Sequence, residues 1–259
     1  MESMGFHHDR ALLDWQIELG ATEAICDAPV NRYEAPEKLE KPAKADPQQA
    51  PSAPMQVAAP DPVAVAERAA QAASTLDELR AAMADYPHCD LRKGARNLVF
   101  SDGTAGAAVM LIGEAPGREE DREGRPFVGA AGQLLDRMLA AIDLGRDRTD
   151  APVYITNVLP WRPPQNRDPK PEEIAMMKPF LLRHIALAQP KLLVIVGNWS
   201  CQALLGKRGI TRLRGNWTEA AGHPALPIFH PAFLLRSPEY KRETWGDLLS
   251  LKARLKTLT

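Results

Sequence analysis

Apolar residues in the second half of the chain form four short continuous runs that alternate with longer amphipathic stretches. The runs cover residues 107–112, 153–155, 192–196 and 226–229. The stretches have helical spacing and cover residues 131–144, 171–188, 199–205 and 243–258. Continuous apolar strands that alternate with helices indicate a parallel sheet covered on both faces. We therefore expect an α/β fold, a three-layer sandwich with a central four-stranded parallel sheet flanked by helices.

The first half of the chain divides by composition. Residues 9–20 cluster their apolar side chains as on one helix face, which predicts a helical segment within an N-terminal region, residues 1–34. Residues 35–62 are rich in Pro, Ala, Lys and Glu, as is typical of a flexible linker. A globular region, residues 63–259, follows and opens with helical spacing over residues 65–85. Since so short a helix needs a surface to dock on, the N-terminal region is a candidate contact for a protein partner.

Composition excludes several classes of protein. The 259 residues are 45% hydrophobic with a formal net charge of −1, so a strongly basic tail is absent while a local basic face stays open. No apolar window is long enough to cross a membrane, and the first residues do not resemble a signal peptide. We expect a monomer in the cytoplasm, without membrane association. The three cysteines include no C-x-x-C pair, which argues against a disulfide framework and a four-thiolate metal site.

Polar residues follow each predicted strand. The strand ends carry Glu114, Asn157, Asn198 and His230. The carboxyl ends of parallel strands share one edge of the sheet, and ligands bind beyond that edge in folds of this kind. We expect these side chains to converge on one site.

Five motifs give the chain a specific resemblance. They are GEAPG at residues 113–117, GRPFVGAAGQLLD at 124–136, ITNVLPWRPPQNRDPKPEE at 155–173, LLVIVG at 192–197 and HPAFLLR at 230–236. From about residue 89 to the C-terminus the chain resembles the family 4 uracil-DNA glycosylases. The resemblance implies a DNA repair enzyme that flips uracil out of DNA and hydrolyses its N-glycosidic bond, leaving an abasic site. Its partner would be uracil-containing DNA. No lysine occupies a motif position suited to a Schiff base, which favours a monofunctional enzyme.

The resemblance also assigns roles to residues. Phe127 would stack on the uracil ring, Asn157 would pair with N3–H and O4, and His230 would donate a hydrogen bond toward O2 as the bond breaks. The rest of the predicted substrate pocket is Gly113, Ala115, Pro116 and Gly117. Family 1 enzymes hold the attacking water with an aspartate where this chain has Ala115. Glu114, the nearest carboxylate, is therefore predicted to position or activate water or to help hold the sugar.

DNA contacts are predicted from an apolar wedge and from basic residues. Leu234 lies four residues after His230, where the resembling enzymes insert a wedge into the gap left by the flipped base. The basic candidates for phosphate contact are Arg118, Arg125, Lys207, Arg208, Arg212, Arg214, Arg236, Lys241 and Arg242. The remaining charges of REEDREGR, residues 118–125, are expected to be a solvated surface.

The chain departs from the family at one group of positions. Family 4 enzymes hold a [4Fe–4S] cluster with four cysteines, and the corresponding residues here are Tyr86, Cys89, Trp161 and Met177. One thiolate cannot hold a cluster that needs four ligands, so we expect no cofactor and a buried structural thiol at Cys89. The loop at residues 162–173 also lacks the histidine through which a related subgroup becomes attached to its product. We therefore expect ordinary turnover.

Two other functions stay open on the sequence. A non-catalytic protein that binds damaged bases or abasic sites could keep this fold and pocket after losing the cluster and the aspartate. A nucleotide-binding regulatory domain unrelated to DNA is the third alternative. Strand scission at uracil after alkali treatment separates an enzyme from a protein that only binds.

Overall fold

The computed structural model describes Leu12, residues 14–17 and residues 61–258, which belong to two units, residues 1–57 and 58–259. In the first unit, Leu12 and residues 14–17 have helical backbone, as the apolar clustering predicts. The predicted linker lies outside the described residues except for its last two. Of these, Asp61 caps helix α2 (Pro62–Ala72), and Pro62 is its first residue. Docking of the N-terminal region on a protein partner stays a prediction.

Four parallel strands form the centre of the second unit. They are β2 (Val109–Gly113), β3 (Val153–Asn157), β4 (Leu192–Val196) and β6 (His223–Ile228). The full order is β1-β3-β2-β4-β6-β5, in which β1 (Asp102–Gly103) and β5 (Thr218–Ala220) pair antiparallel at the two edges. The predicted parallel core is confirmed. The sheet has two more strands than predicted, because runs of two and three residues leave no pattern in the sequence.

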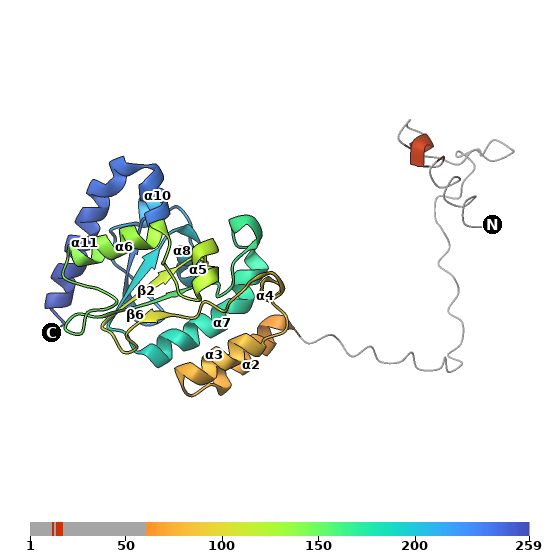
Figure 1. Ribbon diagram of the computed structural model, residues 1–259, viewed down its shortest axis with the longest axis horizontal. Helices are drawn as coiled ribbons and strands as arrows, with labels where there is room; N and C mark the ends of the chain where they lie inside the picture. The colour runs from red at the N-terminus through yellow and green to blue at the C-terminus, as the bar shows by residue number, and fades with distance from the viewer. Residues whose placement is uncertain (1–11, 13, 18–60, 259) are drawn as a thin grey trace, which may run out of the picture. The chain divides into compact units, whose positions relative to one another are not determined.

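Helices cover both faces of this sheet (Figure 1). One face packs against α6 (Ala130–Ala140) and α11 (Lys241–Lys256), and the other against α7 (Pro171–Ala188), with α2 and α3 (Leu76–Asp85) outside it. Side chains alternate along β2. Val109 and Leu111 belong to the apolar cluster that includes α11, while Met110 and Ile112 belong to the cluster that includes α7. All five residues of β2, β3 and β4 are buried, as expected for strands covered on both faces.

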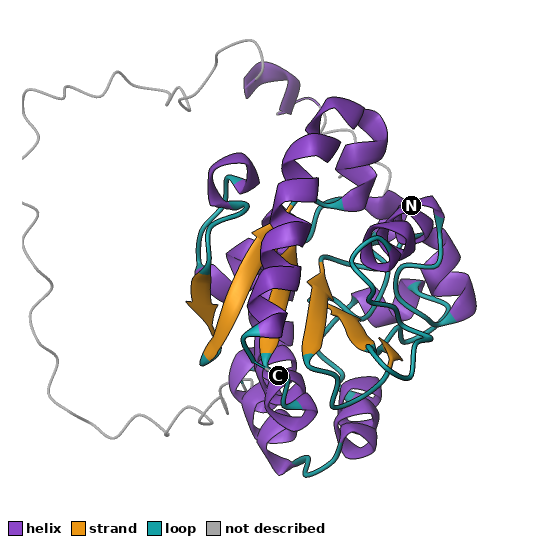
Figure 2. Cartoon of the chain, turned by 90° about the vertical axis from the view of Figure 1, so that its left-hand side faces the viewer, coloured by secondary structure: helices purple, strands orange, loops and turns teal. Residues whose placement is uncertain are grey.

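Residues 65–85, which read as one helix in the sequence, form two. Ala73 is extended, and the Thr75 hydroxyl accepts a hydrogen bond from the backbone N–H of Glu78 at 3.1 Å, so it caps a new helix. The other main helices lie within a few residues of their predicted bounds. The shorter elements are α4 (Leu91–Gly94), α5 (Arg118–Glu123), η1 (Pro164–Asn166), α8 (Asn198–Leu205), α9 (Ile210–Leu213), α10 (Pro231–Arg236) and η2 (Pro238–Tyr240). Figure 2 shows the strands with helices and loops around them.

The strand order fixes where a ligand can bind. The chain passes from β2 outward to β3 and then back across β2 to β4, so the connections leave β2 and β4 in opposite directions. In open α/β sheets this divergence leaves a crevice beyond the carboxyl ends of the two strands. Among the described residues, no helix is both long enough and apolar enough to span a membrane.

Candidate active site

A cavity of about 640 Å³ opens at the carboxyl ends of the parallel strands. Glu114, Asn157, Asn198 and His230, which follow four different strands, all line it. The sequence prediction that these side chains converge is confirmed in position. Ala115, Pro116, Gly117 and Phe127 also line the cavity, so the predicted substrate pocket is assembled in one place. Gly113 lies directly behind this wall.

Asn157 is the least satisfied polar residue of the cavity. Asn157 is 6% exposed, and its Oδ1 atom is buried without a hydrogen-bond partner among the described residues. A buried polar atom left in this state costs about 1–3 kcal/mol. Gly113 lets the amide sit this deep, because a Cβ atom at that position would lie 2.3 Å from Oδ1 and 2.5 Å from the Phe127 ring. The amide is placed to bind a ligand that can both donate and accept.

His230 faces the same cavity as a neutral donor. It is the N-cap of α10, and the backbone N–H of Ala232 donates to its Nδ1 atom at 3.1 Å. The remaining ring proton of the neutral imidazole is therefore on Nε2, which is free to donate to a ligand. Burial, together with the charge of Arg236, lowers the pKa of His230 to about 4. The ring thus carries no charge near neutral pH.

Phe127 presents an aromatic ring beside that imidazole. The two ring centroids are 5.6 Å apart and the planes differ by 28°. The backbone of Phe127 has a φ of +54°, a left-handed conformation that bulky residues rarely adopt and that costs about 1–3 kcal/mol. Such strain persists only where surrounding contacts fix the loop. The ring is 5% exposed and ready to stack on a planar ligand.

Glu114 bridges two loops of the site. One of its carboxylate oxygens accepts a hydrogen bond from the backbone N–H of Trp199 at 2.9 Å, in the first turn of α8. Gly197, with a φ of +95°, allows this contact, because a Cβ atom there would lie 2.4 Å from Oε1. Burial raises the pKa of the Glu114 carboxyl, and the hydrogen bond from Trp199 opposes that shift. The carboxylate is thus partly used to hold the GEAPG loop against α8.

Two acidic residues of REEDREGR are buried, so the prediction of a solvated run is wrong for them. The run forms α5 and turns Glu120 and Asp121 inward. Glu120 accepts hydrogen bonds from the backbone N–H groups of Gly117 at 3.0 Å, Val128 at 3.0 Å and Gly129 at 2.9 Å. It therefore ties the GEAPG loop to the Phe127 loop. Its spacing of three residues after Gly117 is that of a capping box, the one signal that could have identified it.

The basic candidates separate into two groups. Arg208 and Arg236 line the cavity, and the Arg208 guanidinium lies 3.8 Å from the centre of the Trp199 ring. Lys207, Arg212, Arg118, Lys241 and Arg242 are exposed and stay candidates for phosphate contact. Arg214 does not: its guanidinium binds the Asp247 carboxylate, with an Nε–Oδ2 distance of 2.7 Å, and the Glu243 carbonyl. This buried pairing gives Arg214 a structural role.

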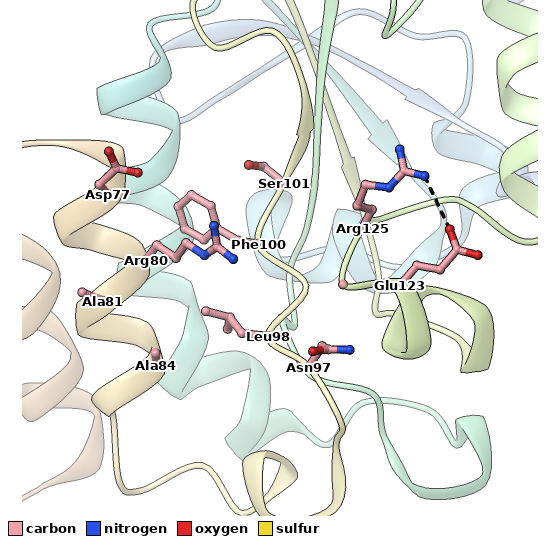
Figure 3. A pocket seen from close by; sticks show the side chains of 11 residues that line it. Asp77, Arg80, Ala81, Ala84, Asn97, Leu98, Phe100, Ser101, Glu123 and Arg125 are labelled. Atoms are coloured by element: carbon pink, nitrogen blue, oxygen red, sulfur yellow. Dashed lines mark hydrogen bonds and ion pairs between the residues drawn. The ribbon is translucent and has the colours of Figure 1, made fainter.

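Arg125 lines a different cavity, of about 680 Å³, together with Glu123 at the end of α5 (Figure 3). There Arg125 lies opposite Arg80 of α3 and is near two carboxylates, Glu123 at 3.5 Å and Asp102 at 3.7 Å. Its guanidinium therefore does not line the cavity that holds Asn157 and His230. A phosphate contact by Arg125 stays a prediction.

The predicted wedge residue, Leu234, is 1% exposed and belongs to the apolar core, so in this structure it does not lie on the surface. The reason is helical phase. Residues 231–236 form α10, and a position four residues after the N-cap returns to the inward face. Leu235, about 100° further round the helix, is 43% exposed. It is the apolar side chain that α10 presents outward.

The four residues at the positions that correspond to the family's cluster cysteines are packed in the apolar core. Tyr86, Cys89, Trp161 and Met177 are 2%, 1%, 3% and 0% exposed, and all belong to one core cluster. The Tyr86 hydroxyl donates to the Pro62 carbonyl at 2.7 Å, and its ring meets Phe180 edge-on. Burial raises the pKa of the Cys89 thiol to about 11. A phenol, an indole, a thioether and a protonated thiol do not fit a cluster that requires four thiolates.

Several cavity residues were not predicted. The loop at residues 163–169 adds Asn166, Arg167 and Asp168 to the wall, and α8 adds Trp199. These residues lie within the segments RPPQNRDP and GNWS. Their spacing does not distinguish a residue that lines the cavity from one that forms a turn.

Comparison with known proteins gives consistent matches. A profile described as the Uracil DNA glycosylase superfamily matches residues 100–249. The type-4 uracil-DNA glycosylase of Archaeoglobus fulgidus is 38% identical over 182 residues, which cover 67% of this chain and 89% of that protein. Its counterpart from Sulfurisphaera tokodaii is 38% identical over 187 residues, covering 69% and 84%. That of Thermotoga maritima is 39% identical over 173 residues, covering 65% and 88%.

The tautomer of His230 yields a direct prediction. Its pKa is lowered from the ordinary 6.5 to about 4, so the ring gains a second proton only as the pH falls through about 4. Nitrogen-15 NMR of the imidazole should show a neutral ring with its proton on Nε2 from pH 8 down to about pH 5. A titration centred near the ordinary histidine value, or a proton on Nδ1, would contradict the geometry described above.

Proposed function

This chain belongs to the uracil-DNA glycosylase superfamily, and we propose that it removes uracil from DNA by hydrolysing the N-glycosidic bond, leaving an abasic site for base excision repair. The observation that carries the proposal is the buried amide of Asn157, which has no partner for Oδ1 and shares a cavity with the free Nε2–H of His230. A flipped uracil supplies what these groups lack: a donor at N3 and acceptors at O4 and O2.

The cavity explains how uracil is recognised. Its ring stacks on Phe127, while the Asn157 amide accepts from N3–H and donates to O4. Cytosine has the opposite pattern at these two atoms, an acceptor at N3 and an amino group at C4. It would leave the buried amide unpaired, and sites of this kind reject such a ligand strongly.

Bond cleavage follows from the position of His230. As the N-glycosidic bond lengthens, negative charge develops on uracil O2, and the neutral Nε2–H donates toward it. A donor held in place before the reaction stabilises this charge without reorganisation. No lysine lines the described cavity, which supports hydrolysis by water without a Schiff base.

Glu114 is the carboxylate proposed to act on the water or the sugar. Ala115 beside it has no group that can accept a proton, and Glu120 is occupied by three backbone N–H groups. Glu114 lines the cavity, and its carboxylate accepts from the backbone N–H groups at the start of α8, Trp199 at 2.9 Å among them. We therefore rank it after Asn157 and His230 in its contribution to rate.

DNA would lie across the carboxyl ends of the strands, where Arg208 and Arg236 line the cavity and Lys207 and Arg212 are exposed nearby. We propose that the protein acts in the cytoplasm, the setting that the sequence predicts. We propose further that the enzyme acts as a monomer and without an iron–sulfur cluster. The unsuitable donor set at Tyr86, Cys89, Trp161 and Met177 supports the last point.

The central experiment incubates the protein with an oligonucleotide that contains one uracil, followed by alkali. The parent should give strand scission at uracil. Asn157→Ala and His230→Ala should each lower turnover by roughly 10²–10³-fold, the usual effect of removing one donor from an anion site. Binding should change little, because phosphate contacts set most of the affinity.

Two further variants complete this assay. Lys178→Ala, on the exposed face of α7, serves as the control and should cleave like the parent. Glu114→Gln keeps an oxygen that can accept from Trp199, so any loss of turnover reports the missing carboxylate charge. Parental cleavage by both the Asn157 and His230 variants would refute the pocket. Binding by the parent without scission would instead support a non-catalytic damage-binding protein.

We propose Leu235 as the wedge, and substitutions of the two neighbouring leucines test this assignment. Leu235→Ala should lower excision from double-stranded DNA by roughly tenfold or more, since opening a base step costs a few kcal/mol. Excision from single-stranded DNA should hardly change. Leu234→Ala removes a core side chain and should instead lower thermal stability, with the ratio between the two substrates unchanged. The reverse pattern would restore Leu234 as the wedge.

The cofactor proposal is tested by iron and acid-labile sulfide analysis, together with a visible absorption spectrum. Protein purified without oxygen should be colourless, and Cys89→Ser should be as active as the parent on uracil-containing DNA. A brown protein with stoichiometric iron and sulfide would refute the proposal.

A further inference from the structure

Phe127 occupies a strained backbone conformation, so something other than local preference must hold its loop. On one side the loop is held by Glu120, which accepts from the N–H groups of the two residues that follow Phe127. On the helix side Gly132 lets α6 pack directly on the Phe127 carbonyl, since a Cβ atom at that position would lie 1.8 Å from its oxygen. These contacts supply no hydrogen-bond donor to the carbonyl groups of Pro126 and Phe127, which therefore need a donor from another segment.

Arg146 supplies these donors from outside the cavity. It is 9% exposed and donates from Nη1 to the Pro126 carbonyl at 3.0 Å and from Nη2 to the Phe127 carbonyl at 2.9 Å. Its remaining donors bind Asp102 at 2.6 Å and Asp136 at 2.9 Å. The two carboxylates balance the buried charge and orient the guanidinium plane.

The described hydrogen bonds of Arg146 go to Asp102, Asp136 and the two loop carbonyls, and none reaches a side chain that lines the Asn157 cavity. It lines neither described cavity, and its side chain reaches the site only through the main chain of residues 126 and 127. Lysine could not replace it, because a single ammonium cannot span two successive carbonyls and two carboxylates as a planar fork does.

From this geometry we infer that Arg146 is a positioning residue for the Phe127 ring. It fixes the two carbonyl groups that flank the left-handed turn and thereby sets the ring against the base that Asn157 and His230 hold. The inference depends on the proposed function, since it takes the Phe127 ring as the surface on which uracil stacks.

The test is a double-mutant cycle with Arg146→Lys and Phe127→Ala. Single-turnover excision of uracil and inhibition by free uracil are measured, because free uracil reads the base pocket without any DNA contact. Arg146→Lys should lower the excision rate roughly ten- to hundredfold, as small misplacements of a bound reactant do, and should weaken inhibition by free uracil. In the Phe127→Ala background it should cause no further loss, because the residue acts through that ring.

Two other variants keep the test decisive. Arg148→Lys is the matched control: Arg148 pairs with Asp150 at the surface, and this change should leave both readouts at parental values. Asp136→Asn loosens the guanidinium from a carboxylate that is 46% exposed, so it replaces Arg146→Lys if that protein fails to fold in circular dichroism and thermal melts. It should give a smaller loss of the same kind.

The outcomes distinguish a failure of the role inferred for Arg146 from a failure of the proposed function. A folded Arg146→Lys with parental excision and parental inhibition overturns the inference. Losses that multiply in the double mutant overturn it as well, because they place the action of Arg146 elsewhere. Phe127→Ala with parental kinetics would refute the stacking role of the ring, and with it the role of Arg146. A parent that does not excise uracil refutes the proposed function itself.

Discussion

A side-chain amide buried beside an aromatic ring with no partner for its oxygen is unfavourable, and the site is organised around that cost. Gly113 is needed because any side chain there would displace both Asn157 and Phe127. The end of β3 is rigid, with every residue of the strand buried, so the amide cannot relax toward water. The unsatisfied group thus becomes specific for a ligand whose edge completes it.

Several charged side chains near the site bind main-chain groups. Glu114, Glu120, Asp121 and Arg146 lie at the loops around the cavity, and each binds backbone groups that would otherwise lack partners. These side chains hold the loops in place through hydrogen bonds to the main chain, although the loops lack the regular hydrogen bonding of a strand. The same residues explain how a non-glycine residue can keep a left-handed backbone at Phe127.

Periodic features of the fold could be predicted from the sequence, and solitary ones could not. The four parallel strands and α7 follow from runs and spacings that persist over many residues, as does the convergence of Asn157 and His230 at one edge. Leu234 was assigned from its distance along the chain, but exposure within α10 depends on helical phase, which differs completely for Leu235. Arg146 stands alone in a turn, and its four acceptors come from distant segments that only the folded chain brings together.

The apolar filling around Cys89 also affects how this protein is made. A fold that needs a metal cluster depends on the supply of that metal. Here α2, α3 and α7 pack through apolar side chains of the chain itself, and the Cys89 thiol in the same cluster is 1% exposed. On the proposal that no cluster is bound, maturation of the domain would not depend on cluster assembly, because Tyr86, Trp161 and Met177 already fill that region with apolar side chains.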